Sequence, residues 1–266
     1  FSSIGLFFFY MAINNKNIPN FYSLAIMVLL PSFMFWTSGV SKDCLILFPI
    51  GILIFYCNKF EKNLPKIFIL IFIILLIRPY LGFLIYFSLL FFYLINIFLN
   101  SKFKISNIFF LFLSGVLSII ILNYIWGINN ISNIYSHINT MKSQYQDALL
   151  AIPPDQNPLI RILSYYFRPA LFDFYNNFYV SIISIENLIL FLIILFLFFN
   201  LNYKNLFLKK ENIFLIFLIL ITSIFFSQFT NNYGTAFRQK WMTLPFIIFF
   251  LISNQKVYYF YNKRKL

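Results

Sequence analysis

The sequence predicts an all-α protein, a polytopic membrane bundle of about nine transmembrane helices. Hydrophobic residues make up 61% of its 266 residues and charged residues only 10%, whereas a soluble domain carries about 25% charged residues. Apolar runs alternate with short polar breaks along the whole chain, and most of the lysines occupy different breaks from most of the arginines. In a bilayer the net charge of +13 lies in loops beside anionic lipid. The composition therefore indicates membrane lipid as a partner, and not nucleic acid.

The apolar runs define the predicted helices, which lie near residues 1–13, 18–36, 44–57, 64–77, 80–99, 106–126, 180–200, 212–229 and 241–254. Crossing the hydrocarbon takes about 20 residues, so the runs at 44–57 and 64–77 are short. Both adjoin a charged break, and irregular backbone at membrane depth must be surrounded by protein or by a water-filled cavity. We therefore expect a cavity that opens at these breaks. Because the chain begins with Phe1 inside an apolar run, we also expect a truncated N-terminus.

The distribution of lysine and arginine predicts which way the bundle faces. Lysines gather within 59–66, 102–104, 204–210 and 256–265, whereas four of the five arginines fall in the alternate breaks. Cytoplasmic loops collect positive charge, so the lysine side is predicted to be cytoplasmic and the arginine side external. The expected location is the plasma (inner) membrane of a bacterial cell. A single multi-pass domain, 1–266, then carries one long external loop at about 127–179.

The external loop at 127–179 is rich in aromatic side chains, including Tyr165 and Tyr166. Because such residues need an apolar floor, we expect one or two short helices that lie on the outer surface and roof the cavity. The loop also holds His137, the single histidine of the chain, and a lone histidine is more typical of a loop surface than of a catalytic centre. The sequence contains no Cys/His cluster or glycine-rich phosphate motif, so neither a metal nor a cofactor is predicted.

The first polar cluster on the external side ends the run at 18–36 and contains Trp36, Ser41, Lys42 and Asp43. Ser41 is placed to cap the next helix, whose N-terminal amides favour an anion. Lys42 strengthens that preference, which indicates a binding site. A capped turn with a local Lys42–Asp43 pair is the alternative interpretation.

The second cluster is Arg78-Pro79, directly after an apolar run. Proline cannot continue a helix in its interior, so the helix is predicted to break at the charge itself. An arginine inside the bilayer costs about 3 kcal/mol on insertion scales, which favours a function for Arg78. An arginine that snorkels from a helix end to the interface is the structural alternative.

Two further clusters lie on the same side. Arg168 and Asp173 stand in the long loop, and Glu186 lies about two turns into the apolar segment that follows. An unpaired carboxylate is expensive there, so Arg168 or Arg238 is its expected partner, and a purely structural ion pair is the alternative. The last cluster, at 231–240, contains Arg238 and Lys240 as candidate binding cations. An amphipathic interfacial turn would also account for it.

These motifs resemble those of a known group of bacterial polytopic proteins associated with capsule, exopolysaccharide or O-antigen synthesis. The matching elements cover most of the chain: Phe35 to Asp43, Arg78-Pro79, Phe167-Arg168-Pro169, Glu186-Asn187 and Asn232 to Arg238. The chain departs from that group at 170–173, where a Pro-Trp-Glu-like sequence is expected. More distantly it is similar to O-antigen polymerases and to membrane glycosyltransferases of the C superfamily. The resemblance implies a polyprenyl-diphosphate-linked sugar bound in an external cavity, and other polysaccharide-assembly proteins as partners.

The chemistry of such a substrate fits the clustered residues. A diphosphate leaving group gains negative charge as the glycosidic bond breaks, and preorganised cations stabilise it. The predicted substrate-binding residues carry charge or an aromatic face on the external side, and they are Lys42, Arg78, Arg168, Arg238, Lys240 and Trp36. Asp43 or Glu186 is the predicted catalytic base for the acceptor hydroxyl. We expect Arg78, Arg168 and Arg238 to line one cavity, with Lys42 and Glu186 near its wall.

Two other functions also fit a polytopic chain. A transporter or flippase places cations in a cavity, but it is expected to have repeated halves and polar residues on several mid-membrane helices. The sequence has neither pattern. A non-catalytic subunit of a polysaccharide-assembly complex needs no converging cations, so it leaves Arg78 and Glu186 unexplained. The favoured function is therefore a glycosyltransferase or polymerase of surface polysaccharide.

Overall fold

The structure is a computed structural model that describes residues 1–14, 30–39, 41–99, 112, 115–116, 157–170, 173, 178–203, 206, 209–230 and 232–255. Most of the predicted segment at 106–126, together with the loop around His137, lies outside these residues. The described chain is helical throughout apart from turns and one isolated bridge between Leu201 and Gln255. The prediction of an all-α protein is confirmed for this part of the chain.

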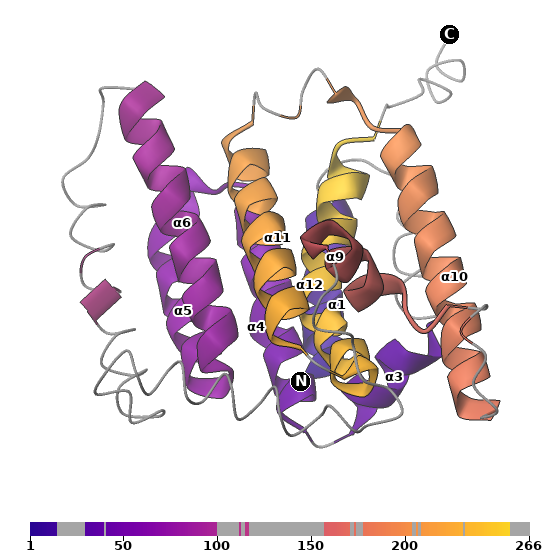
Figure 1. The fold of residues 1–266 in the computed structure, drawn as a ribbon. Helices are drawn as coiled ribbons and strands as arrows, with labels where there is room; N and C mark the ends of the chain where they lie inside the picture. Colours follow the sequence, from indigo (N-terminus) through magenta and orange to yellow (C-terminus); the bar gives the residue numbers. More distant parts are fainter. Residues whose placement is uncertain are drawn as a thin grey trace, which may run out of the picture.

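The described helices form a bundle in which the long helices run roughly side by side (Figure 1). In chain order the elements are α1 (Ser2–Asn14), α3 (Pro31–Ser38), α4 (Lys42–Cys57), η1 (Glu61–Asn63), α5 (Leu64–Ile77), α6 (Pro79–Leu99), α9 (Pro158–Phe167), α10 (Phe178–Phe199), α11 (Lys210–Phe229) and α12 (Tyr233–Ser253). Helices α4, α5, α6, α10 and α11 begin and end within a few residues of the predicted apolar runs. This agreement follows from the apolar composition of each run between polar breaks.

The expectation of about nine membrane spans is not supported by the described residues. Two of their helices are long and apolar enough to cross a membrane, α10 over Val180–Phe199 and α11 over Lys210–Phe229. A third is reached only if α3 and α4, which are bent by 106° at their junction, form one broken span. Helices α1 and α5 are apolar but short. Apolar character thus predicts where the helices of this chain lie, but the length and bend of each helix decide whether it can cross a bilayer.

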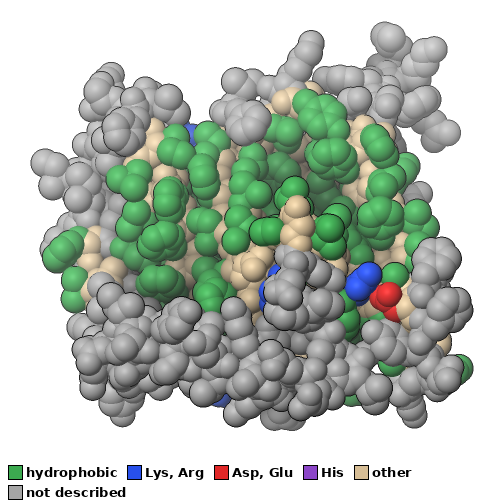
Figure 2. Space-filling view, in the orientation of Figure 1, with side chains coloured by type: hydrophobic (Ala, Val, Ile, Leu, Met, Phe, Trp, Pro, Cys, Tyr) green, Lys and Arg blue, Asp and Glu red, His purple; other side chains and the backbone are tan. Residues whose placement is uncertain are grey.

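Apolar side chains cover most of the described part of the face drawn in Figure 2, over α5, α6, α10 and α11. On α10 these exposed residues include Ile185, Leu192 and Phe196. A water-soluble protein rarely exposes a contiguous apolar surface of this kind. Such a surface is the one expected where helices face lipid.

Helices α1 and α4 approach each other at two glycines. A Cβ atom at Gly51 would collide with the backbone carbonyl of Gly5, and one at Gly5 would collide with the carbonyl of Leu47. Small residues allow helix backbones in a membrane bundle to come this close. The contact places α4, which carries Asp43 at its first turn, firmly against the N-terminal helix.

The two ends of the bundle differ in the way that the loop charges predict. At one end Phe60 packs its ring on Phe92 and Phe214, and the side chains of Asn212 and Asn254 exchange hydrogen bonds. These contacts bring the lysine-containing segments at 58–63 and 209–212 together with residues 253–255 at the end of α12. The breaks that contain Arg78 and Arg238 lie at the opposite end of the bundle (Figure 1).

Helix α9 is the described part of the long loop, and it confirms the prediction of a short helix there. The helix does not lie on the outer surface as expected, because it packs among α10, α11 and α12 (Figure 1). Arg161 is buried and donates to the carbonyls of Ser227 and Gln228 at the end of α11, at 2.6 and 3.1 Å. The Tyr166 hydroxyl lies 2.8 Å from Ser223 Oγ. These polar contacts hold the helix within the bundle.

We predict that Gly51→Ala destabilises the bundle by about 1–3 kcal/mol, as overpacking of a close contact does. Alanine favours a helix by up to about 1 kcal/mol over glycine, but the new methyl group has no space against the Gly5 backbone. Thermal unfolding of the detergent-solubilised chain measures the change. The control is Gly39→Ala, because a Cβ atom at Gly39 meets no other atom within 4 Å. An equal or higher melting temperature for Gly51→Ala would contradict the close α1–α4 approach.

Candidate functional site

Asp43 is the centre of the candidate site, because two arginines from separate helices bind its carboxylate. Arg78 donates from Nη2 to Asp43 Oδ1 at 2.5 Å, and Arg238 donates from Nε to Asp43 Oδ2. The Asp43 side chain is only 7% exposed. Each of its oxygens therefore has a cationic partner, and the three residues form the cation cluster of this site.

The local structure of three elements brings these charges together. Asp43 lies in the first turn of α4, where a carboxylate is favoured by the positive end of the helix dipole. Arg78 is the C-cap of α5, and Pro79 begins α6, so the predicted break at Arg78-Pro79 is confirmed. Arg238 lies in the second turn of α12. The bundle thus brings the three to one end.

Arg78 and Arg238 differ in how tightly the protein holds them. The Arg78 side chain is 17% exposed and also donates to the Tyr80 hydroxyl at 2.9 Å. The Arg238 side chain is 39% exposed, and its guanidinium lies 5.3 Å from the centroid of the Trp36 ring. Arg78 is therefore the fixed member of the cation cluster, and Arg238 is the more accessible one.

Two buried donors of the site have no hydrogen-bond partner among the described residues. They are Nε of Arg78 and Nε1 of Trp36. A buried N–H group without a partner costs about 1–3 kcal/mol, so such atoms are uncommon in folded proteins. Together with the remaining N–H groups of two guanidinium ions, they exceed the acceptor capacity of the single Asp43 carboxylate.

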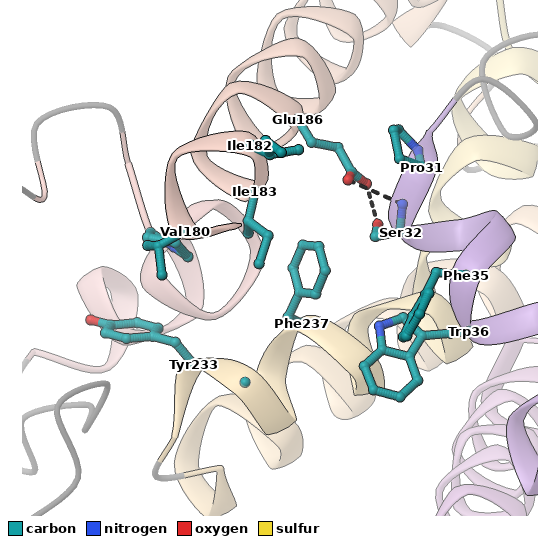
Figure 3. Close-up of a pocket in the computed structure, with 12 residues that line it drawn as sticks. Pro31, Ser32, Phe35, Trp36, Val180, Ile182, Ile183, Glu186, Tyr233 and Phe237 are labelled. Carbon is teal, nitrogen blue, oxygen red and sulfur yellow. Dashed lines mark hydrogen bonds between the residues drawn. The ribbon is translucent and has the colours of Figure 1, made fainter. Parts of the chain in front are cut away.

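A pocket of about 430 Å³ adjoins the cation cluster at Trp36. Its walls come from α3, α10 and α12, and the residues that define it are Phe35, Trp36, Ile183, Glu186, Tyr233 and Phe237 (Figure 3). Most of this lining is apolar or aromatic. The carboxylate of Glu186 is the single ionised group among the lining residues. Cations on one side and an apolar pocket on the other make the site amphipathic.

Glu186 has a different partner from the predicted arginine. Its carboxylate accepts hydrogen bonds from the backbone N–H of Ser32 at 3.2 Å and from the Ser32 hydroxyl (Figure 3). The indole N–H of Trp241 donates to the same hydroxyl at 3.0 Å. Ser32 lies in the first turn of α3, where backbone N–H groups have no partner within the helix. Glu186 supplies that partner from α10, because α3 has no side-chain cap of its own.

Lys240 is buried, whereas its predicted role in substrate binding would require an accessible side chain. It is 1% exposed, and its amine donates to Oδ1 of Asn187 at 2.5 Å. The amine also lies 4.1 Å from the centroid of the Phe237 ring. Asn187 in turn donates to the carbonyl of Pro169 at 3.1 Å. Lys240 therefore braces α10 and the turn after α9 against α12.

The burial of Lys240 follows from the helical structure of the chain around it. Residues 233–240 are helical where an interfacial turn was the alternative, since α12 begins at Tyr233 and not near 241. The side chain of Asn232 caps the helix by accepting a hydrogen bond from Gly234 N at 2.7 Å. Arg238 and Lys240 are therefore carried on helical turns, and the position of each residue on the helix decides whether it faces the cation cluster or α10.

Arg168 and Lys42 lie at the edges of the site. Arg168 donates to the hydroxyl of Tyr233 at 3.2 Å and lies 3.6 Å from Asp173, so it stands beside the pocket and not on the Asp43 carboxylate. Lys42 is exposed at the start of α4. None of the three arginines that were expected to line one cavity is among the lining residues of this pocket. Arg78 and Arg238 share a carboxylate, and Arg168 contacts a lining residue, Tyr233.

The site also contains residues to which sequence reasoning assigned no role. They are Ser32, Tyr80 and Trp241, whose hydrogen bonds reach Glu186, Arg78 and Ser32. Tyr80 had a signal, because it directly follows Arg78-Pro79. Ser32 and Trp241 are 209 positions apart in the chain, and no local pattern connects them.

Comparison with known proteins identifies no relative of this chain. No protein-family model matches it, and neither a curated protein nor a solved structure matches it.

We predict that Asp43→Asn lowers the free energy of unfolding by about 3 kcal/mol, because it leaves two partly buried guanidinium ions without their counter-charge. The matched control is Asp173→Asn. Asp173 faces one arginine, at 3.6 Å and in a more exposed position, so this change is expected to cost about 1 kcal/mol or less. Chemical unfolding of both variants in detergent gives the comparison. Equal stability of the two variants would show that Asp43 does not hold the cation cluster together.

Proposed function

We propose that this chain is a membrane-embedded glycosyltransferase or polymerase that acts on polyprenyl-diphosphate-linked glycans at the external face during bacterial surface-polysaccharide synthesis. The proposal includes a multi-pass location in the plasma (inner) membrane and contact with other polysaccharide-assembly proteins. The observation that supports it best is the pair of arginines on Asp43 beside an apolar pocket. An amphipathic anion is the class of ligand that fits both halves of this site.

The charge of the cation cluster supports an anion as ligand. Arg78 and Arg238 contribute two positive charges against one carboxylate, Asp43, so the cluster carries a net charge of about +1 before any ligand binds. Guanidinium groups bind phosphate oxygens with paired N–H donors. Arg238 uses Nε on Asp43, and its accessible N–H groups are the ones that a diphosphate would meet first.

The site also supports catalysis of glycosyl transfer. Fixed cations stabilise a departing diphosphate more than the intact substrate, because negative charge grows on the leaving group in the transition state. Glu186 is the carboxylate that lines the pocket, so in this proposal it deprotonates the acceptor hydroxyl. Asp43 was the other candidate base. Both of its oxygens bind arginine, so we assign it the role of positioning the two guanidinium groups.

We predict that Arg238→Lys reduces glycan assembly by about a hundredfold, the scale at which loss of a single transition-state donor acts. Lysine keeps the charge but loses the planar fork that binds two phosphate oxygens. The measurement is the amount and chain length of surface glycan in cells that carry the variant as their single copy. Membrane expression is expected to stay at the wild-type level.

The control for this experiment is Arg264→Lys, which makes the same substitution in the basic segment at the C-terminus and is expected to leave glycan assembly unchanged. Wild-type glycan in the Arg238→Lys strain would contradict diphosphate binding by the cation cluster. The expression measurement would detect loss of the variant from the membrane. Diphosphate binding by the purified variant would then show whether its function is also lost.

A further inference from the structure

The ring face and the N–H edge of Trp36 have different surroundings in this site. Its ring face lies against the guanidinium of Arg238, 5.3 Å from the cation to the ring centroid. Its edge carries the indole N–H, which is buried beside the pocket near Phe35 and Phe237 (Figure 3). Trp36 therefore stands at the junction of the cation cluster and the apolar pocket, with one side toward each.

The indole N–H of Trp36 is buried and has no hydrogen-bond partner among the described residues. Trp241 provides the contrast within the same site, because its N–H donates to Ser32 Oγ at 3.0 Å. Tryptophan is a donor only, and a buried N–H normally has a partner. The protein satisfies one of these two indole groups and leaves the other without a partner at the edge of the pocket, where a ligand that displaces the covering side chains supplies an acceptor.

We infer that Trp36 is a specificity-determining residue: its indole N–H binds an oxygen atom of the ligand and thereby selects an organic diphosphate ester over the free inorganic anion. The inference rests on the proposed function and adds to it that the indole N–H of Trp36 recognises the ester by a hydrogen bond. Arg238 binds the anion on the ring side of Trp36, so an oxygen that reaches the N–H side belongs to the part of the ligand that enters the pocket.

The lining of the pocket explains why the bound oxygen carries an organic group. Phe35, Ile183 and Phe237 present apolar surface next to Trp36, and a free phosphate oxygen would lose its water there without compensation. An ester places a carbon chain against this surface and a less charged oxygen at the N–H. A free inorganic anion binds the arginines but gains nothing from the pocket, so the N–H discriminates between the two.

The test uses the purified full chain in detergent and two probes, geranyl diphosphate and inorganic pyrophosphate, with both dissociation constants measured by calorimetry. Trp36→Phe keeps an aromatic face for Arg238 and removes the N–H. We expect it to weaken geranyl diphosphate binding by up to about tenfold, the upper end of the effect of one neutral hydrogen bond, with about the wild-type affinity for pyrophosphate. The ratio of the two constants thus reports the N–H alone, since a weaker ring contact changes both equally.

Two further variants separate the N–H from its surroundings. Trp241→Phe removes an indole N–H that already has an internal partner, so it is expected to leave the ratio of the constants unchanged. Replacing Trp36 with β-(3-benzothienyl)alanine keeps the shape of the ring and exchanges N–H for sulfur. It is expected to reproduce the same change in the ratio, and it decides the question if Trp36→Phe fails to fold.

The outcomes distinguish this inference from the proposed function. If Arg238→Lys weakens the binding of both probes while the two Trp36 variants keep the wild-type ratio, the role of Trp36 is overturned and the anion site stands. If the wild-type chain binds neither probe, both the proposed function and this inference are overturned. A ratio that changes in the Trp36 variants but not in Trp241→Phe supports the assignment.

Discussion

The shared carboxylate of Asp43 is the interaction on which the rest of the site depends. It joins the first turn of α4 to the break between α5 and α6 and to the second turn of α12. Without it, two guanidinium groups would repel each other at the end of an apolar bundle, where the effective dielectric constant is low. The single carboxylate binds both guanidinium groups and so holds the helices together. The net positive charge that remains attracts an anion.

Helix α3 connects the cation cluster to the pocket. Ser32 and Trp36 are four residues apart on it and therefore lie on one face. Ser32 binds Glu186 of α10, and Trp36 lies against Arg238 of α12. The short helix has no side-chain cap of its own, so its position depends on the carboxylate from α10. Its two contacts set the distance between the cations and the pocket lining.

Sequence reasoning succeeded where the physical cause is local. The break at Arg78-Pro79 follows from the geometry of proline, and the ends of α5 and α10 follow from the apolar runs. It failed where the cause is a contact between distant segments. Lys240 was predicted to be a substrate-binding cation, but its amine is buried and donates to Asn187 on α10. Similarly, Glu186 was expected to pair with an arginine. It instead accepts hydrogen bonds from Ser32 of α3, and the cation that interacts with it electrostatically is the buried Lys240.

The sequence by itself determined that the chain is helical and apolar, that most lysines and most arginines fall in alternate polar breaks, and that charged groups interrupt the apolar runs. These properties depend on composition and on the order of neighbouring residues, which act through local hydrogen bonding and the cost of burying charge. Only the tertiary structure decided that Arg78 and Arg238 share Asp43 while Arg168 does not. Pairing of that kind depends on the rotation and tilt of each helix, which packing between distant segments sets.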